Sequence, residues 1–399
     1  MALKVMMAPL RYVQGPDALL QMGEQLQVLG IKHPLILASP SARKAVGAAI
    51  SQGLDAQAIT HKFIDFGGAC TFKEIERIKK ACLEGGHDAV ISCGGGKTLD
   101  TGRAAATGPA LNVEKFPPEF FPQFGAGVAC INVPTVAATD ASTSAVSLVY
   151  TEKGTLEATM VFPTNPTMVF VDTTVIARSP VRLLVAGMGD ALATYFETAM
   201  SVRTATPSVQ TRALATRAAQ ALSRLCLDIL LDFGVQARAE AEAGVPGPGL
   251  EAVAEANVLL SGLGFESGGL SAAHAVGHAF LHIPEYFGAP RFHGELVAFG
   301  TLTQLMLEET KPEYLDKIFG FCKAVGLPTT LADLTLKNLT DEALETVANV
   351  ASRDILMRSM AGARAERDEE GRFYDHVAVL NAIRATDAYG HAFAARGRS

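Results

Sequence analysis

Histidine is concentrated in one short stretch of the chain. Four of the nine histidines fall within the twenty positions from 274 to 293. His274 and His278 are four residues apart in a segment with helical periodicity, so their imidazoles share one face. His293 opens the next element, in PRFHGELVAFG. Because imidazole is a common ligand of transition metals, this grouping predicts a metal or catalytic site. The HExxH signature of zincin proteases is absent, which argues against that class.

A metal bound by two histidines needs at least one further ligand, and Asp190 is the best candidate. It lies in AGMGDALATYFE, an otherwise small and apolar helical stretch. The alternative is a buried aspartate that caps a neighbouring helix, and the residues alone leave both readings open. Two histidines and one carboxylate leave a coordination position for water or substrate, as in catalytic rather than structural sites.

A run of three glycines precedes a lysine in ISCGGGKTLDTGRAAA, residues 91–106. The P-loop motif of nucleotide triphosphatases needs a glycine at position 91, which is Ile91 here. Gly94–Gly96 are predicted to form the turn between a strand and a helix. Glycines there let the backbone approach a phosphate, and the helix start offers unpaired N–H groups. We favour phosphate binding over a plain turn in which Thr98 and Asp100 satisfy the helix start.

Short apolar runs alternate with amphipathic stretches through the first 180 residues. Such alternation predicts a parallel sheet with helices on both faces. The expected strands are Pro34–Ala38, Lys62–Phe66, Asp88–Cys93, Val128–Val133 and Thr167–Asp172, and the expected helices are Ala42–Gln52, Phe72–Glu84 and Lys97–Ala106. Ser144–Tyr150 and Ala158–Phe162 are expected to add a hairpin to this sheet.

Strand signals stop after Pro180, and apolar residues then recur every three or four positions, which predicts a helical bundle. The chain therefore divides into an α/β dinucleotide-binding domain, residues 1–179, and an all-α domain, residues 180–399. The expected helices are Arg182–Met200, Val209–Phe233, Gly249–Leu263, Leu270–His282, Leu296–Glu308, Pro312–Val325 and two near 341–352 and 374–396.

Composition limits the classes of function. The chain of 399 residues is 49% apolar with a net charge of −7 and no basic cluster, which argues against nucleic acid as a partner. No segment has the roughly 18 apolar residues of a membrane span, and the N-terminus lacks a signal-peptide core. Six scattered cysteines without a CxxC pair indicate reduced thiols in a cytoplasmic protein.

Several long motifs resemble one known family. GGGKTLDT, PTVAATDASTSAVSLVYT, AGMGDALATYFE, SGLGFESGGLSAAHAV and HGELVAFGTLTQL are similar to the glycerol dehydrogenases, within the iron-containing (group III) alcohol dehydrogenases. The likeness runs from RYVQG near residue 11 to DAYGHAF near 392. It implies a fold related to dehydroquinate synthase, with a nucleotide-binding α/β domain, a helical domain and the active site in the cleft between them.

The resemblance also assigns residues. It implies that Asp190, His274 and His293 bind the metal, that Asp140 and His274 contact the substrate, and that His278 contacts the nicotinamide or relays a proton. The residues expected to bind the dinucleotide are Gly94, Gly95, Gly96, Lys97, Asp100, Thr135, Ser144, Val146 and Tyr150.

The implied reaction oxidises glycerol to dihydroxyacetone. Zinc would lower the pKa of the secondary hydroxyl, and hydride would pass from C2 to NAD⁺. Thr194 stands where the iron-using branch has a further histidine, which favours zinc, although two histidines and one carboxylate also hold iron. The family further implies a small polyol substrate and a homo-oligomer, possibly an octamer.

Three departures from the family bear on specificity. Ser39 replaces the usual aspartate at the end of the second strand, with Arg43 and Lys44 nearby, so NADP⁺ is predicted to be tolerated or preferred. HAVGHAF replaces HAIHNG, and its later histidine, His278, matches the wider alcohol dehydrogenase branch. A Pro- and Phe-rich insertion occupies residues 111–127 and is expected to make a surface or subunit contact rather than to narrow the cleft.

Three other functions remain as alternatives. An NADP-linked alcohol dehydrogenase or reductase of hydroxyketones or aldehydes would use the same scaffold. A P-loop triphosphatase would need the glycine missing at 91 and a Mg²⁺-binding aspartate. A catalytically silent metal-binding module would bind nucleotide without turnover once zinc is added, and it is disfavoured because cofactor, substrate and metal motifs occur together.

Overall fold

The computed structural model describes residues 2–113 and 118–396. Contacts divide the chain into two compact units. The α/β unit comprises Met7–Leu184 and Ala239–Gly262. The helical unit comprises Val185–Arg238 together with the described residues before Met7 and after Gly262. The segment from Ala239 to Gly262 is helical but packs with the α/β unit, so the chain enters that unit twice.

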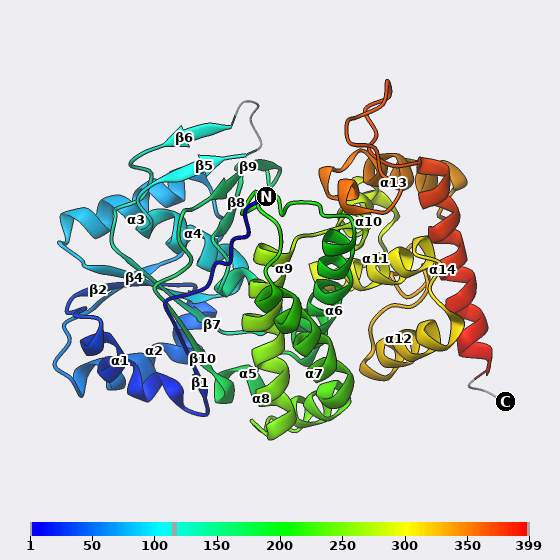
Figure 1. Ribbon diagram of the computed structural model, residues 1–399. Helices are drawn as coiled ribbons and strands as arrows, with labels where there is room; N and C mark the ends of the chain where they lie inside the picture. Colours follow the sequence, from blue (N-terminus) through cyan, green and yellow to red (C-terminus); the bar gives the residue numbers. More distant parts are fainter. Residues whose placement is uncertain (1, 114–117, 397–399) are drawn as a thin grey trace. The chain divides into compact units, whose positions relative to one another are not determined.

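A parallel sheet of six strands is the centre of the α/β unit (Figure 1). Its strands are β1 (Arg11–Gly15), β2 (Pro34–Ala38), β3 (Lys62–Asp65), β4 (Ala89–Gly94), β7 (Ala129–Pro134) and β10 (Met168–Asp172). The spatial order is β1-β10-β7-β4-β2-β3, and all five neighbouring pairs are parallel. The five predicted strands are confirmed to within one residue at each end. The edge strand β1 was not predicted, because RYVQG has no apolar run.

Helices cover both faces of this sheet because its strands alternate apolar residues between two cores. Ile36 and Ala38 pack with α1 (Met22–Val28) and α2 (Pro40–Asp55) on one side. Leu35 and Leu37 pack with α3 (Phe72–Glu84) and α4 (Gly96–Ala106) on the other. This period of two is the geometry of a strand buried on both faces, and the predicted helices are confirmed.

The strand order reverses between β2 and β4. The chain first runs outward from β2 to β3 and then continues on the other side of β2 through β4, β7 and β10. This is the flavodoxin-like order, in which ligands bind beyond the carboxyl ends of the strands at the reversal. Those ends carry Ser39, just after β2, and the turn Gly94–Gly96, which starts at the last residue of β4.

The hairpin prediction is correct in pairing but wrong in placement. β8 (Val146–Tyr150) and β9 (Leu156–Val161) are antiparallel, and they belong to a separate sheet of order β6-β5-β9-β8. β5 (Ala110–Asn112) takes the free edge of β9, so the hairpin does not extend the parallel sheet. β6 (Glu119–Phe121) lies in the predicted insertion, of which 114–117 fall outside the described residues. Phe121 and Phe124 of this insertion pack against the core that contains Phe162.

The helical unit surrounds a core contributed by α10, α11, α13 and α14. Its helices are α6 (Val181–Arg203), α7 (Arg217–Glu242), α9 (Ser261–Gly268), α10 (Ala272–Ala279), α11 (His293–Leu307), α12 (Pro312–Val325), α13 (Asp341–Arg353) and α14 (His376–Arg396), of which α6, α7 and α9 cross a unit boundary. α5 (Thr173–Ala177), α8 (Pro248–Glu255) and a π-helical turn, η3 (Ala256–Leu260), complete the α/β unit. The prediction that α7 starts at Val209 is wrong, because Arg212 adopts a left-handed φ of 53° that a helix cannot contain.

The structure also bears on the cysteines and on the apolar character of the helices. All six cysteines are buried and unpaired. Among the helices that the structure describes, none combines the length and the apolar character needed to cross a bilayer.

Candidate active site

The structure brings Asp190, His274 and His293 together in the helical unit. Asp190 is in the middle of α6, His274 is on the first turn of α10, and His293 begins α11. Asp190 Oδ1 lies 3.4 Å from His274 Nε2 and 3.2 Å from His293 Nε2. One ligand atom from each residue lies within 4.8 Å of the other two. Three elements distant in sequence therefore converge on one point.

Backbone contact between α6 and the start of α11 places His293 beside Asp190. A Cβ atom at Gly294 would lie 1.8 Å from the carbonyl oxygen of Ala186, and one at Gly189 would lie 2.3 Å from the carbonyl oxygen of Gly294. Any side chain at either position would separate the two helices, so glycine is required at this crossing. The glycines of AGMGDALATYFE and HGELVAFG therefore serve the packing that assembles the site.

The three donors fit a divalent metal ion. A tetrahedral zinc site with bonds of about 2.0–2.2 Å holds neighbouring ligand atoms about 3.3–3.6 Å apart, close to the observed 3.2 and 3.4 Å. Asp190 is 4% exposed, and its Oδ1 accepts no hydrogen bond of normal geometry within the described part of the chain. A buried carboxylate oxygen aimed at two imidazole nitrogens is the arrangement expected of a ligand set.

The ionisable side chains of this cluster shift one another's pKa values. Burial would raise the pKa of Asp190, but His293 and His274 more than offset this and hold it well below its usual range. Burial opposes a charge on His274, yet Glu197 and Asp190 raise its pKa well above the ordinary value. The pKa of His278 is lowered well below 6.5, first by burial and then by His293 and His274.

His278 lies on the same face of α10 as His274, one turn further along. Its ring stacks on that of His293 with centroids 5.4 Å apart and stands edge-on to His274 at 5.7 Å. The ring is therefore adjacent to the ligand set, and its lowered pKa favours the neutral form, which can relay a proton.

Sequence reasoning missed Glu197. Its carboxylate is fully buried and lies 2.7 Å from Nδ1 of His274, opposite the nitrogen that faces Asp190. A signal was present, because Asp190, Thr194 and Glu197 recur at intervals of four and three residues and therefore share one face of α6. Thr194, also buried, carries no strong metal ligand on this face.

The glycine run occupies the predicted strand–helix turn of the α/β unit. Gly94 ends β4, Gly95 is the N-cap of α4 and Gly96 is its first residue. No side chain caps this helix, so its first N–H groups are not taken by a capping oxygen. A Cβ at Gly95 would meet nothing within 4 Å, and Lys97 is exposed. Open space beside the N-terminus of a helix can accommodate a phosphate group.

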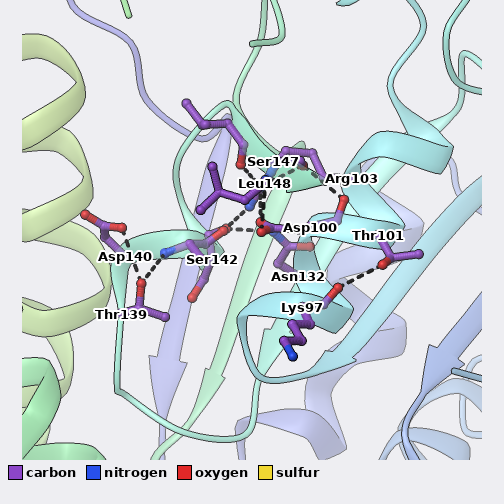
Figure 2. A network of polar contacts seen from close by, with 12 residues as sticks. Lys97, Asp100, Thr101, Arg103, Asn132, Thr139, Asp140, Ser142, Ser147 and Leu148 are labelled. Carbon is purple, nitrogen blue, oxygen red and sulfur yellow. Dashed lines mark hydrogen bonds and ion pairs between the residues drawn. The ribbon is translucent and has the colours of Figure 1, made fainter. Parts of the chain in front are cut away.

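Asp100 and Arg103, one turn apart on α4, form a buried ion pair at 2.9 Å (Figure 2). The Arg103 side chain is 0% exposed and also donates to the carbonyl oxygens of Ala141 and Val146. The second carboxylate oxygen of Asp100 accepts from the amide of Leu148 at 3.2 Å. Burial raises the pKa of Asp100 to about 6, with Arg103 acting in the opposite direction. The pair thus ties α4 to β8 and to the turn η2 (Asp140–Ser142).

Asp140 opens this turn and is half-buried. Thr139 caps it by accepting from the amide of Ala141 (Figure 2). The π-helical turn η3 supports the same segment, because Thr143 donates to the carbonyl of Val258 at 2.7 Å. The hydroxyl of Ser261 lies 3.4 Å from Asp140 Oδ2. The Asp140 carboxylate is therefore held in a defined place within the α/β unit.

The other expected cofactor residues lie around this network. The amide of Thr135, just after β7, donates to the carbonyl of Gly94 at 3.1 Å. Ser144 is buried behind η2 and its amide bonds to the carbonyl of Asp140 at 3.3 Å. Val146 and Tyr150 are the two ends of β8. The structure thus brings the glycine run, Asp140 and these four residues into one region of the α/β unit.

Comparison with known proteins agrees with this geometry. The family model described as iron-containing alcohol dehydrogenase matches residues 9–173. The glycerol dehydrogenase of Citrobacter freundii is 41% identical over 346 residues, which is 87% of this chain and 89% of the relative. This chain belongs to the iron-containing alcohol dehydrogenase family.

Two further members extend the comparison. The crystal structure of glycerol dehydrogenase from Schizosaccharomyces pombe superposes with a TM-score of 0.85 at 31% identity and covers 100% of this chain and 93% of that one. The glycolaldehyde reductase of Halobacterium salinarum is 34% identical, over 87% of this chain and 89% of the relative. The similarity of this alcohol dehydrogenase to its relatives therefore spans both units.

Proposed function

We propose that this alcohol dehydrogenase oxidises glycerol to dihydroxyacetone with NAD⁺ and a bound zinc ion. The observation that carries the proposal is the convergence of Asp190, His274 and His293, with Nε2 of both imidazoles within 3.4 Å of one carboxylate oxygen. Similarity to glycerol dehydrogenases over 87% of the chain supports glycerol as the substrate.

The three ligands would hold the ion at an open coordination position. When bound, a divalent ion lowers the pKa of an alcohol hydroxyl, and NAD⁺ accepts the hydride. Two histidines and one carboxylate accommodate iron as well as zinc. We favour zinc because Thr194, one helical turn from Asp190, adds no fourth ligand.

The other candidate site residues would bind and orient the cofactor and the substrate. The uncapped start of α4 and the open space beside Gly95 would receive the pyrophosphate. Asp140 would accept a hydrogen bond from a substrate hydroxyl. His278, whose ring stacks on that of His293, would contact the nicotinamide or relay the proton released on oxidation. We assign Asp100 to support of the Asp140 turn, because both of its oxygens already have partners within the protein.

A second candidate is the reduction of a small hydroxyaldehyde with NADPH. The observation that favours it lies at the end of β2. Ser39 is uncharged there and caps α2 by accepting from the amide of Ala42 at 3.2 Å. The nearby Arg43 is half-exposed, paired with Asp65 at 3.2 Å. Ser39 carries no carboxylate that would repel a 2′-phosphate, and Arg43 would bind that phosphate by exchanging its partner Asp65 for it.

Substrate and cofactor can be tested together. Initial rates for glycerol oxidation, dihydroxyacetone reduction and glycolaldehyde reduction, each with both cofactors, give six values of kcat/KM for zinc-loaded enzyme. The proposal expects the largest oxidation value with glycerol and NAD⁺. If kcat/KM for glycolaldehyde with NADPH exceeds kcat/KM for dihydroxyacetone with NADH tenfold, the second candidate is favoured. No turnover of glycerol, dihydroxyacetone or glycolaldehyde would reject both candidate functions.

A further inference from the structure

We propose that Glu197 is a positioning residue for metal binding: it fixes the proton of His274 on Nδ1 and thereby leaves Nε2 free to bind the ion. The inference rests on the proposed function, since it takes His274 as a metal ligand. It adds a carboxyl group, buried behind the ligand set, to the three donors that converge on the site.

The contacts of Glu197 are complete and specific. One carboxylate oxygen accepts from the backbone amides of Ser271 and His274, at 2.8 and 3.0 Å. The other lies 2.7 Å from Nδ1 of His274. The side chain is 0% exposed, and no lysine or arginine is paired with it in the described part of the chain. These polar contacts therefore all go to His274 and to the backbone at the start of α10.

This arrangement decides which nitrogen of His274 carries the proton. Oε1 of Glu197 already accepts from two backbone amides, and Oε2 lies 2.7 Å from Nδ1, so Nδ1 is placed to donate to the carboxylate. Nε2, the nitrogen that lies 3.4 Å from Asp190 Oδ1, is then the one that gives up its proton when a metal ion binds. A carboxylate that accepts from the far nitrogen of a ligating histidine fixes the ring and makes it a better ligand. With zinc bound, the two carboxylates of Asp190 and Glu197 would also balance the charge of the ion.

A purely structural role is the competing explanation, because a carboxylate at the start of α10 caps the helix. Glu197→Gln separates the two roles. The amide oxygen can still accept from Ser271 and His274, so the cap is retained. The amide nitrogen can only donate, so Nδ1 must become the acceptor and the proton moves to Nε2, where it blocks the metal.

Gln304 offers a matched control. Its side-chain oxygen accepts from the amide of Ala273 at 3.0 Å, so it caps the same helix start without touching a histidine. Gln304→Ala should therefore lower the melting temperature and leave zinc affinity unchanged. Glu197→Gln should leave the melting temperature of metal-free protein nearly unchanged and weaken zinc binding about 10–100-fold, the range for such outer partners.

The measurement is competition for zinc between chelator-treated protein and a fluorescent chelator, with the two variants beside the wild type. No zinc binding by the wild type would reject the proposed function itself. Equal affinities of the wild type and Glu197→Gln would reject the role of Glu197 alone. If Glu197→Gln does not fold, ¹⁵N NMR of the zinc-loaded wild type decides: a proton on Nδ1 of His274 supports the inference, and zinc on Nδ1 overturns it.

Discussion

Arg103 is the residue on which the Asp140 turn depends most, and Arg103→Met tests this. The side chain is 0% exposed and is bound by the Asp100 carboxylate, the carbonyls of Ala141 and Val146, and the hydroxyl of Ser147 at 3.3 Å. Methionine retains much of the volume but none of the donors. Removal of Arg103 would therefore leave a buried carboxylate and two carbonyl oxygens without their partner.

The magnitude follows from these contacts. Loss of one partner of a buried ion pair costs about 3–5 kcal/mol. Because burial already raises the pKa of Asp100 to about 6, a proton can neutralise the abandoned carboxylate and limit the penalty. We therefore expect the free energy of unfolding at pH 7 to fall by about 3 kcal/mol, at the lower end of the range. Asp100→Asn in the same chain should recover part of this loss, since it removes the uncompensated charge.

The assay is urea unfolding of metal-free protein at neutral pH, with Lys80→Met as the control. Lys80 also pairs with an acid, Glu84, on a helix of the same unit, but the two side chains are 69% and 68% exposed. Exposed pairs contribute about 0–1 kcal/mol. If Arg103→Met cost less than about 1 kcal/mol, as expected for Lys80→Met, the assignment of Arg103 as the anchor of this turn would be wrong.

Three further predictions address the metal, the pH dependence and the cofactor. Asp190→Asn should weaken zinc binding by more than about 100-fold, beyond the effect of outer partners, and equilibrium dialysis would detect any retained zinc. Burial raises the folded pKa of Asp100 to about 6, above the value of about 3.9 in unfolded chains, so the folded protein holds this proton more tightly. The free energy of unfolding of the wild type relative to Asp100→Asn should thus fall by up to about 3 kcal/mol from pH 4 to pH 7, and a pH-independent difference in urea unfolding would contradict it. Ser39→Asp should weaken NADPH binding at least about tenfold relative to NADH because a carboxylate repels the 2′-phosphate; equal changes in the two fluorescence-titrated dissociation constants would refute that reasoning.

Features set by local sequence could be predicted. Strands such as Pro34–Ala38 are short apolar runs that a sheet covered on both faces requires, and the turn at Gly94–Gly96 follows from its glycines. The metal cluster was anticipated from the spacing of His274 and His278 and from long family motifs. Those motifs also named Asp190 and His293, which the structure brings within reach of one ion.

Features that depend on tertiary packing could not be predicted from local sequence patterns. Glu197 and Arg103 look like polar positions on amphipathic helices, where charged residues normally face water. They are buried because α6 and α4 are covered on more than one side, and each then requires a specific partner. The sheet that β8 joins was also unpredictable locally, since either sheet can satisfy the same pattern of residues.

The central claim is that a metal ion held by Asp190, His274 and His293 is required for alcohol oxidation. Its most direct test is titration of chelator-treated enzyme with zinc while the rate of glycerol oxidation is followed. We expect no rate without metal and a linear return of the rate that saturates at about one zinc per chain, with no return in Asp190→Asn. Full activity of protein shown to be metal-free would contradict it.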